Sequence, residues 1–308
     1  MTHYIPALTW LRSYDSTQFR DDLIAAVIVT ILLIPQSLAY AMLAGVPPEV
    51  GLYASILPLI GYAIFGTSRT LSVGPVAVIS LMTATSLGSV VQQLNVSYVE
   101  AATTLALLSG AMLTAMGVLR LGFITHFLSH AVISGFISAS GIIIAIGQLK
   151  HIVGIDATGG DLTRLVPSYL NQLEQFHLAT FILGAAVIAL LYVAKSFAAK
   201  GLIALGLKSS IATPLARTTP IIAVALSIIA VISMGLEQQG VAITGDIPSG
   251  LPSFNLTLPS LKLIELLWLP ALLISIIGYV ESVSVGRTLA AKRQQKIDPN
   301  QELLGLGA

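Results

Sequence analysis

The sequence predicts an all-α integral membrane protein, and three observations support this fold class. Hydrophobic residues make up 55% of the 308 residues and charged residues only 9%, whereas soluble domains carry roughly 25% charged residues. The mean hydropathy is strongly positive. The apolar residues also gather in stretches of about 20, the length that an α-helix needs to cross a bilayer.

Eight such stretches are expected to cross the membrane. They lie at about 23–44, 50–66, 70–91, 101–119, 124–149, 178–194, 218–236 and 263–286. The fifth is long enough to include an amphipathic lead-in, and the second is short. Residues 1–22 are polar and precede an apolar run that is too long for a signal peptide. We interpret them as an N-terminal segment outside the membrane.

The basic residues predict the orientation. Of the 15 lysines and arginines, only Lys150, Arg164 and Lys262 fall on loops that are outside when the N-terminus is inside. Basic residues prefer the cytoplasmic side, so we expect a multi-pass protein of the plasma or inner membrane with a cytoplasmic N-terminus, in contact with lipid. A net charge of +1 gives no basis for nucleic-acid binding. The sequence has no cysteine, which excludes disulfides and thiolate metal sites.

The third stretch contains residues that do not suit an uninterrupted helix. Ser72, Gly74 and Pro75 predict a short extended piece followed by a helix that begins at Pro75, because proline is favoured at the first helical position. A helix that begins partway through a bilayer directs free backbone N–H groups and a partial positive charge at whatever lies before it. We therefore predict an anion-binding site. Its residues are Ser72, Val73, Gly74, Pro75, Val76 and Ala77.

The first stretch holds a polar cluster beside Pro35. Gln36 and Tyr40 lie four residues apart, so both can face one side of a helix, and Ser37 lies between them. Polar groups next to a proline-broken helix are typical of transporter sites. We predict that Gln36, Ser37 and Tyr40 line the substrate site. The alternative is that Gln36 only hydrogen-bonds a neighbouring helix.

The eighth stretch carries a carboxylate on a face of small and polar residues. Spacings of three and four relate Ser275, Gly278, Glu281, Ser282 and Gly286. An intramembrane carboxylate is costly and by default suggests a functional role, so we predict that Glu281, with Ser282, couples transport to a proton or a sodium ion. Two alternatives stay open: Glu281 pairs with Arg287 at the interface, or it is a structural hydrogen-bonding group.

The sequence indicates no cofactor and no catalytic group. His126 and His130 have a spacing that can hold a metal on a helix, but no third ligand accompanies them. No nucleophile lies with a base, and no Walker loop is present. We therefore expect neither a metal site nor an enzyme.

Several of these motifs, in the same order, resemble the signatures of the SulP family of sulfate permeases and anion exchangers. They are residues 34–41 (IPQSLAYA), 51–55 (GLYAS), 66–69 (GTSR), 72–77 (SVGPVA), 129–136 (SHAVISGF), 248–252 (PSGLP) and 281–282 (ES). The resemblance covers the chain from about residue 21 onward.

The resemblance implies an elevator-type transporter with fourteen spans in two inverted repeats of seven, divided into a core and a gate domain and usually followed by a cytoplasmic STAS domain. On that plan the chain holds the first repeat and the eighth span, with a short extended segment before half-helix three. The expected parts are a cytoplasmic segment at 1–22, core spans one to four at 23–119, gate spans five to seven at 120–236, an extracellular or periplasmic loop at 237–262, core span eight at 263–290, and a cytoplasmic linker with the start of span nine at 291–308.

The resemblance also places the anion between half-helices three and ten, flanked by spans one and eight. It favours sulfate uptake, in a homodimer when full length, and the intramembrane carboxylate Glu281 adds the expectation of proton symport. Alternatives are a bicarbonate or dicarboxylate carrier of the same family, coupled to protons or sodium, and a non-transporting membrane remnant or scaffold. Residues 300–305 (NQELLG) resemble the start of span nine, close to where the chain ends at Ala308. We expect a fragment that cannot transport alone, because the opposing half-helix is missing.

Overall fold

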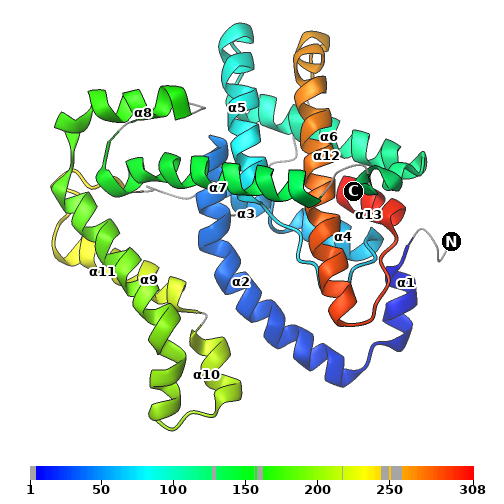
Figure 1. Cartoon of the computed structure of the whole chain (residues 1–308), viewed down its shortest axis with the longest axis horizontal. Coiled ribbons are helices and arrows are strands. Elements are labelled where there is room, and N and C mark those ends of the chain that lie inside the picture. The colour runs from blue at the N-terminus through cyan, green and yellow to red at the C-terminus, as the bar shows by residue number, and fades with distance from the viewer. Residues whose placement is uncertain are drawn as a thin grey trace. The chain divides into compact units, whose positions relative to one another are not determined.

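The protein is described by a computed structural model that contains helices and no strand in its described part (Figure 1). The structure describes residues 5–126, 130–155, 157, 162–216, 218–243, 250 and 259–308. Most of the motif at 248–252, Ser129, and the side chains of His126, His130 and Arg164 lie outside the described part. The prediction of an all-α protein is confirmed for the residues described.

Six helical segments in the described part are long and apolar enough to cross a membrane. They are α2 (Ser16–Ala44), α3 (Pro48–Tyr53) taken together with α4 (Leu57–Phe65), α5 (Ala77–Leu94), α6 (Tyr98–Val118), α9 (Leu178–Ala204) and α12 (Leu261–Lys292). The predicted fifth and seventh spans correspond to shorter apolar stretches, in α7 (His130–Val153) and α11 (Thr219–Ser233). These helices agree with a multi-pass membrane protein.

The remaining helical elements are short. They are α1 (Ala7–Trp10), η1 (Leu11–Ser13), η2 (Leu121–His126), α8 (Leu162–Asn171), η3 (Leu173–Gln175), α10 (Ser209–Ala216) and α13 (Pro299–Gly307). The last of these, α13, occupies the position where the sequence predicts the start of a ninth span.

Capping residues explain several helix ends. The Asp15 side chain accepts a hydrogen bond from the Gln18 backbone N–H at 2.7 Å, so α2 begins well before the predicted apolar stretch. The same helix continues through Pro35 and ends at Gly45, which has a φ of 80°. Ser97 caps α6 and Ser260 caps α12 in the same manner as Asp15 caps α2.

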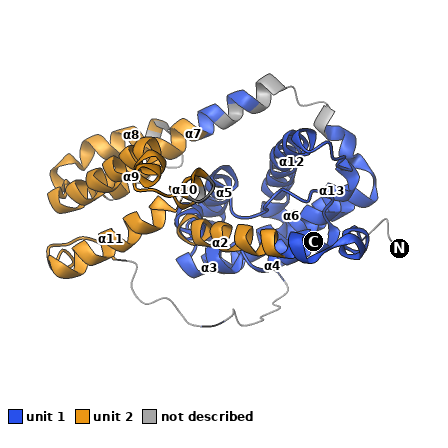
Figure 2. Cartoon of the chain, turned by 90° about the horizontal axis from the view of Figure 1, so that it is seen from below, with its two compact units in different colours: residues 1–19, 37–140, 248–308 blue, residues 20–36, 141–247 orange. Residues whose placement is uncertain are grey.

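The described chain divides into two compact units (Figure 2). The first comprises Met1–Phe19, Ser37–Ser140 and Pro248–Ala308, and the second comprises Arg20–Gln36 and Gly141–Ile247. Both α2 and α7 contribute to each unit. Most of the predicted site residues belong to the first unit, so that unit positions the site.

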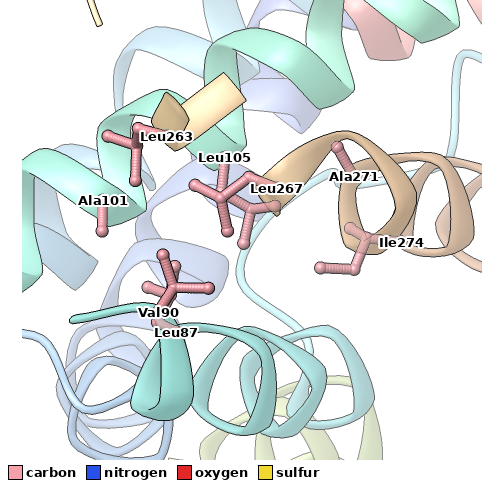
Figure 3. Close-up of a cluster of buried hydrophobic side chains, with 8 residues drawn as sticks. All are labelled: Leu87, Val90, Ala101, Leu105, Leu263, Leu267, Ala271 and Ile274. Atoms are coloured by element: carbon pink, nitrogen blue, oxygen red, sulfur yellow. The ribbon is translucent and has the colours of Figure 1, made fainter. Parts of the chain in front are cut away.

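The first unit is built around α12, which packs against α5 and α6. Its main apolar cluster takes side chains from all three helices (Figure 3). These are Leu87, Val90, Ala101, Leu105, Leu263, Leu267, Ala271 and Ile274. A second cluster joins α6 and α12 to Leu303 of α13. The α12 stretch that carries Glu281 is therefore held by packing against α6 and α13 within this unit.

In the second unit, hydrogen bonds link α8 to α7, and they also link the start of α9 to the segment that follows α11. The Tyr169 hydroxyl of α8 donates to the Ile146 carbonyl of α7 at 2.8 Å and accepts from the Lys150 N–H at 2.6 Å. His177, which caps α9, lies 2.6 Å through Nε2 from the Gln239 carbonyl. The second unit is thus held together at its loops by side-chain to backbone hydrogen bonds.

Candidate functional site

The predicted break in the third stretch is present as a non-helical segment. Residues 66–76 connect α4 to α5 without helical structure. Near the start of this segment the Ser68 hydroxyl accepts a hydrogen bond from the Leu71 N–H at 3.2 Å, which makes a local side-chain turn. Ser72 and Val76 are exposed. The polar and glycine-containing run therefore leads into α5 without helical structure and with two exposed side chains.

The helix after the break begins at Ala77, so the predicted start at Pro75 is wrong. Val76 has extended backbone angles, with φ −123° and ψ 142°, and its carbonyl accepts the first helical hydrogen bond from Ser80 at 2.9 Å. Proline fixes its own φ but not the conformation of the residue after it. Val76 is β-branched and favours extended backbone. Pro75 therefore precedes the cap position instead of opening the helix.

The N-terminal end of α5 has no side-chain cap for its first backbone N–H groups. The first N–H groups of a helix have no acceptor within the helix, and Val76 provides no side-chain cap. The aligned peptide dipoles place about half a positive charge at such an end. An anion in front of Ala77 would accept these hydrogen bonds and interact favourably with the dipole.

The helix α12 passes beside this end of α5. A methyl group at Gly278 would lie 3.5 Å from Ile79 in the first turn of α5, and one at Gly286 would lie 3.9 Å from Leu71 in the extended segment. Ser282 is four residues from each glycine, so it lies on the same face of α12. Glu281, next to it, is partly buried. The structure thus brings Glu281 and Ser282 to the stretch of α12 that flanks residues 71–79.

Ser275, at the other end of the small and polar stripe, has a packing role. The residue is 1% exposed. Its hydroxyl donates to the Ala271 carbonyl at 2.7 Å and lies 2.9 Å from the Ser109 hydroxyl of α6. These contacts join α12 to α6. Ser275 therefore packs α12 against α6, and the site prediction for this helix concerns Glu281 and Ser282.

The three residues predicted from the first span have different surroundings. Ser37 is fully buried, and its hydroxyl lies 2.6 Å from the hydroxyl of Ser55, which donates to the Gly51 carbonyl. A side chain at Gly51 would collide with the Ser37 carbonyl, so α2 and α3 cross closely there. Tyr40 is partly buried. Gln36 is exposed and belongs to the second unit.

Sequence reasoning missed a buried carboxylate, Glu302 of α13. Its side chain is fully buried and accepts four hydrogen bonds from residues at the start of the extended segment and the end of α4. A sequence signal was present: Glu302 is followed directly by the apolar residues Leu303 and Leu304, shortly after Pro299. The partners of Glu302 could not be predicted because they lie 234 to 240 positions away along the chain.

The described part holds six helical segments that are long and apolar enough to cross a membrane, and these define a class: multi-pass integral membrane proteins. The sequence model of the Sulfate permease family matches residues 19–308. The chain belongs to this family. That family assignment confirms the resemblance drawn from the motifs.

Two curated relatives illustrate the similarity. The chain is 36% identical over 304 residues to sulfate transporter 4.1, chloroplastic, of Arabidopsis thaliana. The aligned region covers 98% of this chain and 43% of the relative. It is 35% identical over 305 residues to the probable sulfate transporter MT1781 of Mycobacterium tuberculosis, covering 99% of this chain and 52% of the relative. The chain therefore spans about half the length of these relatives.

Two solved structures share the fold. The murine Solute Carrier 26 family member A9 anion transporter, in an inward-facing state, matches with a TM-score of 0.85 and 27% identity over 99% of this chain and 51% of its own. The transmembrane domain of the cyanobacterium bicarbonate transporter BicA matches with a TM-score of 0.78 and 20% identity over 96% of this chain and 72% of its own. The second match supports the fold alone.

Proposed function

We propose that this chain forms the part of a membrane transporter that binds an inorganic anion, most favourably sulfate, at the N-terminal end of α5. The observation that carries the proposal is the uncapped start of α5 at Ala77, after an extended segment that leaves Ser72 and Val76 exposed. The sulfate transporters among the relatives support the choice of anion. The proposed site residues are those of the extended segment, residues 72–76, and Ala77 at the start of α5, with Ser37 and Tyr40 of α2 contributing from the first span.

The dipole of α5 cannot bind a divalent anion by itself. A helix end contributes roughly 0.3 to 2 kcal/mol in favour of a negative charge, which is small compared with the cost of removing water from an ion. The site must therefore keep water or gain further donors. The exposure of Ser72 and Val76 is consistent with a site that stays hydrated.

We assign Glu281 the coupling role, with Ser282 beside it on α12. A carboxylate near an incoming anion repels it, and protonation removes that repulsion, so uptake of a proton favours uptake of the anion. On this mechanism the substrate and the proton enter together. Sodium bound at the same carboxylate is the alternative, because a cation neutralises the charge in the same way.

Glu281→Gln is expected to remove the pH dependence of sulfate uptake while exchange of bound for external sulfate continues. The glutamine mimics the protonated carboxylate and cannot titrate. Uptake into proteoliposomes containing the full-length gene product, measured across external pH, tests this. Glu265→Gln is the matched control, since Glu265 is an exposed carboxylate on the same helix. An unchanged pH profile in Glu281→Gln rules out the coupling role, and loss of uptake when choline replaces sodium identifies sodium instead.

The 308 residues alone are expected to give no concentrative uptake. The relatives are about twice as long, and the α5 end supplies donors from one side of the anion only. Reconstitution of this chain by itself, with sulfate uptake followed against a pH gradient, measures this. Accumulation of sulfate above the external concentration contradicts it and shows that one helix end with its flanking residues is sufficient.

Competition distinguishes the candidate substrates. Labelled sulfate uptake by the full-length gene product is measured in the presence of bicarbonate, succinate, oxalate or chloride. Strong competition by bicarbonate or succinate favours the bicarbonate or dicarboxylate carrier. Absence of uptake for every anion favours a non-transporting membrane scaffold.

Two further proposals can be tested in the same proteoliposomes. Cross-linking tests whether the protein is a homodimer, and labelling of the N-terminus from one side of the membrane tests its cytoplasmic location.

A further inference from the structure

We propose that Glu302 is a positioning residue that anchors the extended segment before α5 and so fixes the anion-binding end of that helix. The inference rests on the proposed function of the α5 end, and it adds a residue from α13 to the site. It assigns a role to a buried carboxylate that neither binds the anion nor couples transport to an ion.

The carboxylate joins three parts of the first unit. Glu302 Oε2 accepts a hydrogen bond from the Tyr62 hydroxyl of α4 at 2.5 Å. Oε1 accepts from the Thr67 N–H at 2.8 Å, the Thr67 hydroxyl at 2.5 Å and the Ser68 N–H at 3.2 Å. Both oxygens therefore have partners, and two of the four donors are backbone groups of the extended segment itself.

Thr67 connects the anchor to the start of α13 as well. Its hydroxyl donates its only proton to Glu302 and accepts a hydrogen bond from the Asp298 N–H at 3.3 Å. Asp298 in turn caps α13 through the N–H groups of Asn300 and Gln301. The position of Thr67 is thus determined by the Glu302 side chain of α13 and by the backbone N–H of Asp298, the cap residue of the same helix.

The helix that carries the anchor is itself held closely. The Asn300 side chain accepts from the Gly122 N–H at 2.9 Å, and the Gln301 side chain donates to the Phe65 carbonyl at 2.7 Å. A methyl group on Gly305 would lie 2.8 Å from the Gly66 Cα, closer than such atoms normally approach. Because α13 is fixed on both sides, a group bonded to Glu302 is fixed too.

Charge explains why a carboxylate is needed here. Hydrogen bonds to an ionised acceptor are roughly twice as strong as those between neutral groups. Burying a charge is costly unless it is fully hydrogen-bonded, and the four donors meet that requirement for Glu302. Removing the carboxylate leaves the partly buried N–H groups of Thr67 and Ser68 without this acceptor, so the segment is expected to rearrange toward water. The end of α5 then loses its defined position.

Hydrogen exchange in the full-length gene product tests the anchor directly. Without sulfate, Glu302→Ala is expected to raise the exchange rate of the peptide that covers residues 66–74 at least tenfold, because loss of a charge-assisted hydrogen bond changes an opening equilibrium by about that factor. Glu100→Ala is the matched control, since Glu100 is an exposed carboxylate in the first turn of α6. It is expected to leave that peptide unchanged.

Transport kinetics separate positioning from a purely structural role. Glu302→Ala is expected to raise the KM for sulfate about tenfold in the folded protein. Glu302→Asp keeps the carboxylate and is expected to raise the KM by a smaller factor. If Glu302→Ala does not fold, Tyr62→Phe and Thr67→Val each remove one donor and are expected to raise exchange and KM by smaller factors. A residue that only supports folding lowers the amount of folded protein but leaves KM unchanged.

The outcomes are distinct. Unchanged exchange at residues 66–74 in the alanine variant, or in both single-donor variants when the alanine variant does not fold, overturns the anchor. Raised exchange with unchanged KM also overturns the positioning role. If the unsubstituted protein takes up no sulfate, the proposed function fails, yet the exchange result still decides whether Glu302 holds the segment.

Discussion

Val76→Asp is expected to stabilise the protein and to abolish anion uptake. Val76 is the cap residue of α5, has extended backbone angles and provides no side-chain hydrogen bond. Aspartate at such a position accepts from the first N–H groups and typically stabilises a helix by about 1 kcal/mol. The same carboxylate then occupies the donors that the anion requires. One substitution is therefore expected to have opposite effects on stability and on function.

The size of the functional effect follows from the charges involved. Two unit charges 4 Å apart interact by about 4 kcal/mol at an effective dielectric constant of 20, whereas the helix end contributes roughly 0.3 to 2 kcal/mol in favour of the anion. Repulsion by the introduced carboxylate exceeds the attraction by the dipole. Uptake is expected to fall at least a hundredfold.

Two matched variants separate charge from capping. Val76→Asn caps the helix without a charge, so it is expected to raise the melting temperature and to retain more uptake than Val76→Asp. Asn95→Asp adds a charge at the other end of α5, where Asn95 has a φ of 52°, and is expected to leave uptake unchanged. Melting temperature and sulfate uptake are measured on the same preparations. Full uptake by Val76→Asp places the anion elsewhere.

Gly305→Ala is expected to destabilise the protein by about 1 to 3 kcal/mol, the usual cost of overpacking. The added methyl group would lie 2.8 Å from the Gly66 Cα and 2.9 Å from its nitrogen, and backbone atoms cannot move aside as a flexible side chain can. Separation of α13 from the end of α4 also weakens the contacts of Glu302. The variant is expected to have a lower melting temperature and a lower affinity for sulfate than the unsubstituted protein.

Gly88→Ala is the opposite case and serves as the control. Gly88 lies inside α5, and no atom within 4 Å would meet an added methyl group. Alanine is favoured over glycine in a helix by roughly 0.5 to 1 kcal/mol. Thermal unfolding of purified protein in detergent compares the two variants. If both change the melting temperature in the same direction, the close approach of α13 to Gly66 is not present in the protein.

The membrane helices could be predicted because their signal is local. A run of apolar residues specifies a span, and side chains such as Ser97 and Ser260 specify where a helix begins. The break before α5 was predicted for the same reason, from Gly74 and Pro75. The predicted start of the helix after the break was wrong by two residues. The choice between Pro75 and Ala77 depends on the conformation of Val76, which the motif does not specify.

The role of Glu302 could not be predicted because its partners are distant in sequence. Thr67 and Ser68 are 235 and 234 positions away, and only folding brings them to α13. The surroundings of Ser37 have the same origin, since its hydroxyl meets Ser55 across the crossing of α2 and α3. Polarity within an apolar segment predicts that a residue has a partner, but the fold decides which one.

In the proposed site, backbone N–H groups at the start of α5 bind the anion. Selenate is an isostere of sulfate with a strong anomalous signal, so a crystal of the full-length gene product grown with selenate locates the anion directly. We expect an anomalous peak within hydrogen-bond distance of the backbone nitrogens at residues 77–79, next to Ser72 and the Glu281 stretch of α12. A peak bound instead to lysine or arginine side chains, with the start of α5 unoccupied, contradicts it.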